Sequence, residues 1–181
     1  MSTGRKKVKR RKFLKIGLAA GASGLLMSCG RTGGGPHWRF FTAEEARTVD
    51  AICEQIIPAD DFPGASQAGV VNFIDLQLTR HYKKHRAAYR KGIANVDSVS
   101  RETFGKRFTE LEPQQQIEVL TTIEEKDSAF FALIRNHTMQ GYYGDPRHGG
   151  NRDWVSWKML ALASPPVRGR ARLKNDEGRV S

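Results

Sequence analysis

Apolar side chains recur at helical spacing through the middle of this 181-residue chain, and no stretch alternates apolar and polar residues in the manner of a strand. The first helical pattern runs from 43 to 57, and Pro58 ends it because proline cannot continue a helix. Further helical patterns cover about 67–82, 89–104, 113–123 and 128–141. The sequence therefore predicts an all-α domain of five or more helices within residues 40–163.

Polar residues predict where several of these helices begin. Thr42, followed three residues later by Glu45, forms a capping-box pattern. Pro113 suits the first helical position, where its missing N–H is not needed. We expect Ser128 to cap the next helix. The turn-forming residues 59–65 predict a loop after the first helix.

The N-terminus carries the pattern of an export signal. Arg10 and Arg11 are followed by Phe13, Leu14 and then an apolar run over 16–27. This run is shorter than the roughly 20 residues of a membrane-spanning helix. It is typical of a twin-arginine signal peptide, here residues 1–28, with those four residues as the export signal. The twin-arginine route carries folded proteins, so we expect a periplasmic location.

Cys29 ends the sequence Leu-Met-Ser-Cys, which resembles a bacterial lipobox. In the first interpretation Cys29 is lipidated, residues 29–39 form a flexible linker, and the protein is associated with the membrane. In the second interpretation, cleavage nearby simply removes Cys29. Both interpretations leave the folded body unchanged.

The net charge of +11 belongs mainly to the two ends of the chain. Residues 1–28 hold eight basic side chains and no acidic one, and residues 168–181 hold five basic and two acidic. Residues 40–167 hold 15 basic and 17 acidic side chains, a net charge of about −2. This balance argues against a nucleic-acid partner. We expect the basic stretch 164–181 to be disordered.

Two cysteines limit the redox chemistry of the chain. Cys53 is the only cysteine in the body, so the body can form no internal disulfide. No CxxCH motif is present, which excludes attached c-type haem, and two cysteines are too few for a cysteine-ligated iron–sulfur cluster. On its apolar helix face, Cys53 is interpreted as a small buried hydrophobic residue.

The histidines offer weak candidates for a site. His81 and His85 are four residues apart and would share a helix face, a spacing that can hold a metal. Lysines and arginine surround them, so a solvated face is the preferred interpretation. His137 could act as a catalytic base, although partial burial in a helix is preferred.

Paired carboxylates and glycines offer further weak candidates. The pairs 60–61 and 124–125 could serve acid–base chemistry, but Asp60 follows a helix-ending proline, where a loop-ordering hydrogen bond is favoured. Gly149-Gly150-Asn151 lacks the GxGxxG spacing of a dinucleotide loop. We therefore assign no catalytic, cofactor-binding or metal-binding residue to this chain.

The segment Gly141–Lys158 combines turn-forming residues with large aromatic side chains, a composition that fits either a structural loop or an ordered recognition loop. We expect Trp154 and Trp157 to share a helix face, in the core or against a partner. The candidate interface residues are Tyr142, Tyr143, Asp145, Pro146, Arg147, Gly149, Gly150, Asn151, Arg152, Asp153, Trp154, Trp157 and Lys158.

Residues from about 40 to 162 resemble the subunit 3 (gamma subunit) family of gluconate 2-dehydrogenase. Its late motif is similar to Thr138, Gly141-Tyr142-Tyr143, Pro146, Gly149-Gly150-Asn151-Arg152-Asp153 and Trp157-Lys158. The earlier part of the resemblance lies in 49–60, 69–75, Phe108 and 111–116. His148 stands where an aromatic residue is more usual, and Ala161 where glycine is common.

The resemblance implies a non-catalytic small subunit that supports export, maturation and membrane anchoring of a flavoprotein. The implied partner is a large FAD-dependent dehydrogenase of the glucose–methanol–choline type, which oxidises a sugar or sugar acid, and a cytochrome c subunit often accompanies it. FAD is then expected in the partner and no cofactor in this chain.

Two other hypotheses remain at this point. One is a free-standing lipoprotein enzyme acting on sugars, with a site around His137, Asp145, Arg147 and His148. The other is a structural envelope lipoprotein without a redox partner.

Overall fold

The computed structural model describes residues 37–162, and in that range the chain forms six α-helices, four short 3₁₀ turns and no strand. The helices are α1 (Ala43–Ile56), α2 (Val70–Leu78), α3 (Arg86–Phe104), α4 (Pro113–Lys126), α5 (Ser128–Tyr143) and α6 (Val155–Met159). The 3₁₀ turns are Lys83–His85, Phe108–Glu110, Pro146–His148 and Arg152–Trp154. The predicted all-α domain is confirmed. The predicted signal, Cys29 and residues 164–181 lie outside the described residues.

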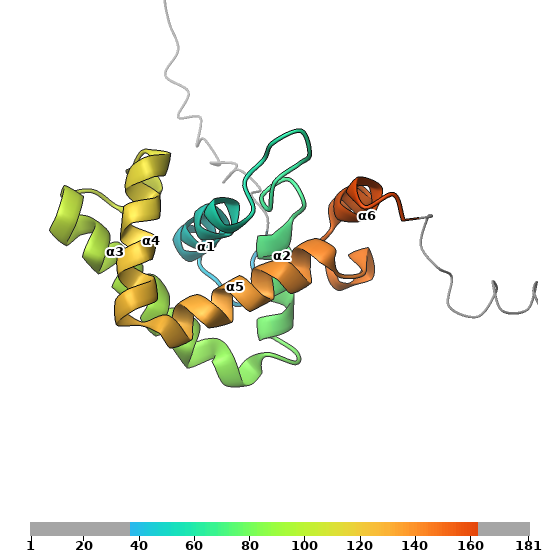
Figure 1. The fold of residues 1–181 in the computed structure, drawn as a ribbon. Coiled ribbons are helices and arrows are strands. Elements are labelled where there is room, and N and C mark those ends of the chain that lie inside the picture. The colour runs from blue at the N-terminus through green and yellow to red at the C-terminus, as the bar shows by residue number, and fades with distance from the viewer. Residues whose placement is uncertain (1–36, 163–181) are drawn as a thin grey trace, which may run out of the picture. The chain divides into compact units, whose positions relative to one another are not determined.

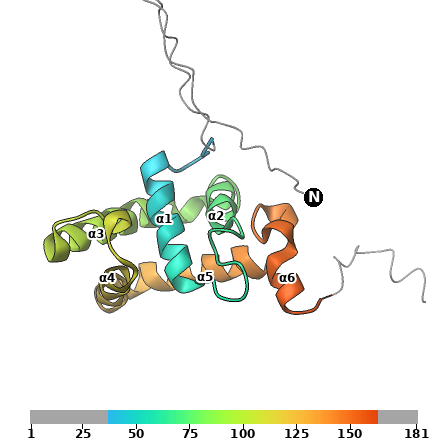
Figure 2. The same ribbon diagram turned by 90° about the horizontal axis from the view of Figure 1, so that it is seen from above.

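Helix α5 runs along the domain and joins its two ends (Figure 1). Helices α3 and α4 pack together at one end, and α6 packs against α5 at the other. Helices α1 and α2 lie side by side across α5 (Figure 2). The segments before α1 and after α5 thus meet at α2, although they are far apart in the sequence.

Local sequence explains most helix boundaries. The capping box at α1 is confirmed: Thr42 Oγ1 accepts from Glu45 N at 3.2 Å, and Glu45 Oε2 accepts from Thr42 N at 2.8 Å. Pro113 occupies the first turn of α4 as predicted. The prediction that Ser128 caps α5 is wrong. The cap is Asp127, whose carboxylate accepts from Phe130 N at 3.3 Å, and Ser128 is already helical.

Helix α2 is shorter than the 67–82 that the sequence predicts. Gly69 takes a left-handed φ of 71°, which interrupts the helical path before Val70. At the other end, Arg80 N and Tyr82 N both donate to Gln77 O, so the chain turns away from the helix axis. Helix α5 continues to Tyr143, past the predicted end at 141.

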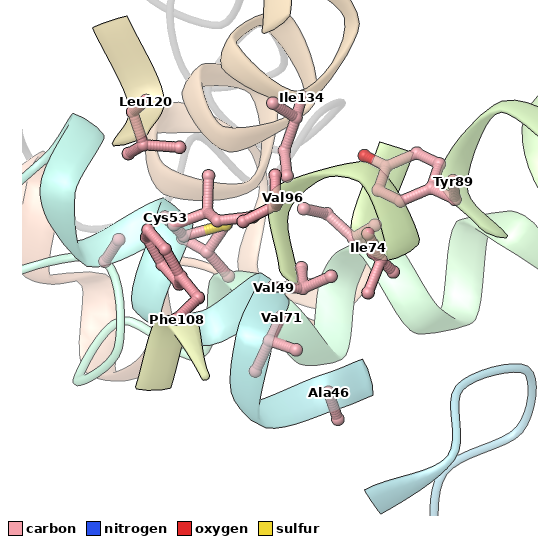
Figure 3. Close-up of a cluster of buried hydrophobic side chains, with 14 of the residues drawn as sticks. Ala46, Val49, Cys53, Val71, Ile74, Tyr89, Val96, Phe108, Leu120 and Ile134 are labelled. Atoms are coloured by element: carbon pink, nitrogen blue, oxygen red, sulfur yellow. The ribbon is translucent and has the colours of Figure 1, made fainter. Parts of the chain in front are cut away.

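The core is a single apolar cluster drawn from α1 to α5, of which Figure 3 shows the central part. Cys53 is fully buried and lies among Val49, Phe108 and Leu120 (Figure 3). Its thiol makes a 3.2 Å hydrogen bond with Thr138 Oγ1, and burial raises its pKa to about 12. The interpretation of Cys53 as a buried small residue is confirmed.

Asp75 is a fully buried carboxylate in the middle of the apolar helix α2. Its two oxygens accept from the backbone N–H groups of Arg39 at 2.8 Å, Phe40 at 2.9 Å and Phe41 at 3.0 Å. The Arg39 guanidinium lies 3.7 Å away. Asp75 therefore fixes the segment that leads into α1 against α2.

Candidate partner interface

Two adjoining hollows lie where α1, the start of α2 and the segment after α5 meet. One has a volume of about 280 Å³ and the other about 310 Å³, and Asn72 and Arg152 line both of them. We call the pair the α1–α2 groove; its main lining residues are Trp38, Asp50, Ser66, Asn72, Arg152 and Trp154.

Asp50 lines this groove, and one of its carboxylate oxygens lacks a hydrogen-bond donor among the described residues. Its Oδ2 accepts from Ser66 Oγ at 2.9 Å, but Oδ1 is buried and has no donor among the described residues. Burial raises the pKa of Asp50, while the Ser66 hydrogen bond and the nearby Arg152 charge act in the opposite direction. A buried acceptor without a donor is costly, so a ligand that brings a donor would be favoured there.

Arg152 reaches the groove by crossing the start of α2. Its backbone N–H donates to Ala68 O at 2.9 Å. Its guanidinium lies over Gly69, where an added Cβ would be only 3.1 Å from Nη2. Gly69 thus serves two purposes, because it takes a left-handed φ and leaves room for the guanidinium.

Glycines and Asn151 hold the segment after α5 in place. The carbonyl of Gly149 accepts from Asn72 Nδ2 at 2.7 Å. Gly150 packs directly on the Gly141 backbone, with no room for a Cβ. The buried Asn151 donates to Gly144 O at 2.9 Å and accepts from Ser156 N at 3.1 Å. In these contacts, the sequence Gly149-Gly150-Asn151 has a structural role.

Three of the four residues 151–154 adopt left-handed backbone conformations without being glycine. Their φ values are 45° for Asn151, 56° for Asp153 and 56° for Trp154. Such conformations cost about 1–3 kcal/mol each and persist where the surrounding structure imposes them. Here they turn Arg152, Asp153 and the indole of Trp154 toward solvent.

Replacing Asn151 with alanine should lower the free energy of unfolding by about 2 kcal/mol, because two buried backbone groups lose their partners. Asn151→Asp keeps the acceptor for Ser156 N but loses the donor to Gly144 O, so it should also destabilise the fold. Chemical denaturation measures both variants, with Lys158→Ala as a control, because Lys158 is exposed and has no left-handed φ. An Asn151→Ala variant as stable as the wild type would contradict the structural role.

The predicted interface residues divide by exposure. Tyr142, Gly150 and Asn151 are buried, and Tyr142 OH donates to Pro63 O at 2.7 Å, so none of the three offers a surface for contact. Pro146, Gly149, Asp145 and Trp157 are half-buried. The exposed members are Tyr143, Arg147, Arg152, Asp153, Trp154 and Lys158.

Asp145 and Arg147 satisfy each other. The Asp145 carboxylate accepts from Arg147 N at 3.0 Å, Nε at 2.9 Å and Nη2 at 2.6 Å. These hydrogen bonds lower the pKa of Asp145 to about 2. The two residues therefore stabilise the turn 145–147 that contains them.

The two tryptophans do not share a helix face, contrary to the prediction. Trp154 precedes α6 with its left-handed backbone and is 43% exposed. Trp157 lies within α6, half-buried, and its Nε1 donates to Tyr143 O at 2.9 Å. The backbone reversal at Asp153 and Trp154 separates the two side chains, and helical spacing cannot reveal it.

His137 is a core residue. It is 4% exposed, stacks on Tyr82 with ring centroids 4.0 Å apart, and shares a 2.9 Å hydrogen bond between Nδ1 and Tyr89 OH. Burial, followed by the charge of His85, lowers its pKa to about 4. The structure does not bring this ring into a site with Asp145 and Arg147, which form the surface turn described above.

This burial predicts an acid-sensitive contribution to stability. The pKa of His137 is about 4 in the folded protein against 6.5 for a solvated imidazole, so the unfolded chain binds more protons between these values. Stability should be full above pH 6.5 and fall by about 3 kcal/mol toward pH 4. Denaturation at several pH values measures this slope, and His137→Gln should flatten it. Parallel pH profiles for the two proteins would refute the assignment.

His81 and His85 lie in different surroundings. His81 is exposed in the turn after α2, whereas His85 ends a 3₁₀ turn and packs its ring 5.4 Å from His137. The prediction that both occupy one solvated helix face is therefore wrong for His85. Within residues 37–162 no group of three His, Cys, Asp or Glu side chains could hold a metal ion.

Asp60 makes the hydrogen bond that was predicted to order the loop after α1, because its carboxylate accepts from Phe62 N at 2.8 Å.

Comparison with known families gives one match over this domain. Residues 43–162 match the model of the family described as gluconate 2-dehydrogenase subunit 3. The chain belongs to this family. The match covers all six helices and the segment that carries Arg152 and Trp154. Searches of curated proteins and of solved structures returned no match.

Sequence reasoning missed the half of the groove that lies before α5. Asp50 and Ser66 were not singled out, and neither was Trp38. A signal exists for Asp75, since a lone charge within an apolar helix must find partners. The groove residues carry no such signal, because they come together only when α1, α2 and the late segment pack.

Proposed function

We propose that this chain is the non-catalytic small subunit of a periplasmic FAD-dependent dehydrogenase that oxidises a sugar or sugar acid. In this proposal it supports the export, maturation and membrane anchoring of a flavoprotein of the glucose–methanol–choline type, alongside a cytochrome c subunit where one is present. The observation that carries the proposal is membership of the gluconate 2-dehydrogenase subunit 3 family over residues 43–162.

The positions of the candidate catalytic groups support an accessory role. His137 is enclosed by the rings of Tyr82 and Tyr89, and Asp145 is occupied by Arg147. A general base must lie within hydrogen-bond reach of a substrate proton, which a ring that is 4% exposed does not offer. The sequence motif at Arg10 and Arg11 fits the same role, since a folded flavoprotein needs a route for folded proteins. No helix within residues 37–162 is long and apolar enough to cross a membrane.

Co-purification tests this proposal. A C-terminally tagged full chain, expressed in its own organism, should bring down a flavoprotein whose FAD is released by denaturing the eluate and measured by fluorescence. The chain purified alone should show no turnover of glucose or gluconate with an artificial electron acceptor. An eluate without FAD, or turnover by the isolated chain, would count against the proposal.

A further inference from the structure

Two charged side chains of opposite sign, those of Asp50 and Arg152, lie close together in the α1–α2 groove. Asp50 Oδ1 is buried and has no donor within the described part of the chain. The Arg152 guanidinium lies beside it over Gly69 and makes no side-chain hydrogen bond within residues 37–162. A ligand that brings a donor to the buried Asp50 oxygen and an acceptor to the exposed Arg152 guanidinium would complement both groups.

The groove is extended and ends in an exposed aromatic side chain. Its two hollows share Asn72 and Arg152, and the second one reaches Trp154. That indole is 43% exposed, and a left-handed backbone holds it in place. Exposed tryptophan and arginine side chains are the residue types that contribute most to protein–protein binding.

We propose that the α1–α2 groove receives an extended segment of the flavoprotein subunit, whose peptide groups or polar side chains bring a donor to Asp50 and an acceptor to Arg152, while an apolar residue packs on Trp154. This inference rests on the proposed function and assigns it a surface. A peptide unit carries a donor and an acceptor side by side, which matches the Asp50 oxygen that lacks a donor in the described residues and the exposed Arg152 guanidinium. The neighbouring Arg47 and Asp153 add one charge of each sign at the rim.

The chemistry favours a protein segment over a sugar. A single sugar ring would fill one hollow and leave the exposed Trp154 of the other without a contact. The indole of Trp154 is 43% exposed, and an apolar side chain of a protein segment would cover it, whereas a small polar ligand in the first hollow would not. The experiment must therefore distinguish binding of a sugar from binding of a protein segment.

Three substitutions test the groove in the full-length subunit, with the flavoprotein that co-purifies with the wild type as the binding partner. Asp50→Asn removes the charge with little change in shape, and Arg152→Ala removes the guanidinium. Trp154→Asn removes the indole and keeps a residue that tolerates a left-handed φ. Each should weaken binding about tenfold or more in a surface-based binding measurement.

Matched controls lie on other faces of the domain. Ile117→Ala changes an apolar side chain on α4 that is 45% exposed, and Lys126→Ala removes a charge at the end of that helix. Both should bind the flavoprotein as the wild type does. Thermal unfolding of every variant identifies loss of fold, and if Asp50→Asn unfolds early, Arg152→Ala and Trp154→Asn decide the result.

The outcomes separate this inference from the proposed function. Wild-type binding that all three groove variants retain would overturn the groove and leave the accessory role standing. A wild type that binds no flavoprotein would overturn both. Calorimetry of the isolated subunit with glucose and with gluconate should show no heat of binding. Binding of either that Asp50→Asn abolishes would identify a sugar pocket and overturn the protein-segment proposal.

Discussion

Replacing Asp75 with alanine is expected to lower the free energy of unfolding by about 4 kcal/mol, the largest effect we predict for a polar residue. The carboxylate is fully buried and accepts from three consecutive backbone N–H groups, those of Arg39, Phe40 and Phe41. Alanine would leave all three donors without this acceptor. The melting temperature should fall by about 10 °C or more.

Two further variants identify the cause. Asp75→Asn keeps one acceptor oxygen and should be destabilised less than Asp75→Ala. Asp61→Ala removes an exposed carboxylate that makes no hydrogen bond in the described residues and should change stability little. Chemical denaturation measures all three. If Asp75→Ala and Asp61→Ala were equally stable, the segment before α1 would not depend on this carboxylate.

Replacing Gly150 with alanine should be comparably damaging, at about 4 kcal/mol, because the new methyl group would collide with backbone atoms. An added Cβ would press on the carbonyl oxygen of Gly141 and lie 2.9 Å from its carbonyl carbon. Neither α5 nor the Gly149–Asn151 sequence can move away without breaking the bonds of Asn151. The change would therefore also displace Arg152 and Trp154 from the groove.

Gly105→Ala provides the matched comparison. Gly105 has a left-handed φ of 70° at the end of α3, and an added Cβ would meet no atom within 4 Å. This variant suffers only backbone strain, so it should cost about 1 kcal/mol. Thermal denaturation of the two variants separates steric collision from strain. Equal losses would show that the close contact of Gly150 with the Gly141 backbone does not limit stability.

Helical spacing was sufficient to predict the class of fold, because burial of one face is a local property of each helix. The capping box at Thr42 and the position of Pro113 follow from the same local rules. The start of α2 could not be predicted, since Gly69 takes its left-handed conformation where the Arg152 guanidinium packs on it. That contact joins residues 83 positions apart.

Only the part of the α1–α2 groove that comes from the segment after α5 could be predicted from the sequence. The composition of the segment Gly141–Lys158 pointed to Arg152 and Trp154, but periodicity placed Trp154 on a helix that begins after it. Asp50 gave no signal, since an acidic residue beside the apolar face of α1 is ordinary in a sequence. Only the packing of α1 and α2 leaves its Oδ1 without a donor.

The location of flavoprotein activity in cells tests the central proposal most directly. Dehydrogenase activity with an artificial electron acceptor would be measured in periplasmic, membrane and cytoplasmic fractions of the wild type and of a strain that lacks this chain. A strain carrying Arg10→Lys with Arg11→Lys tests the signal separately. We predict that loss of the chain removes the activity from the periplasmic and membrane fractions, that the wild-type gene restores it, and that the double-lysine variant does not. Activity that stays in the periplasm at the wild-type level without this chain would contradict its proposed role in export.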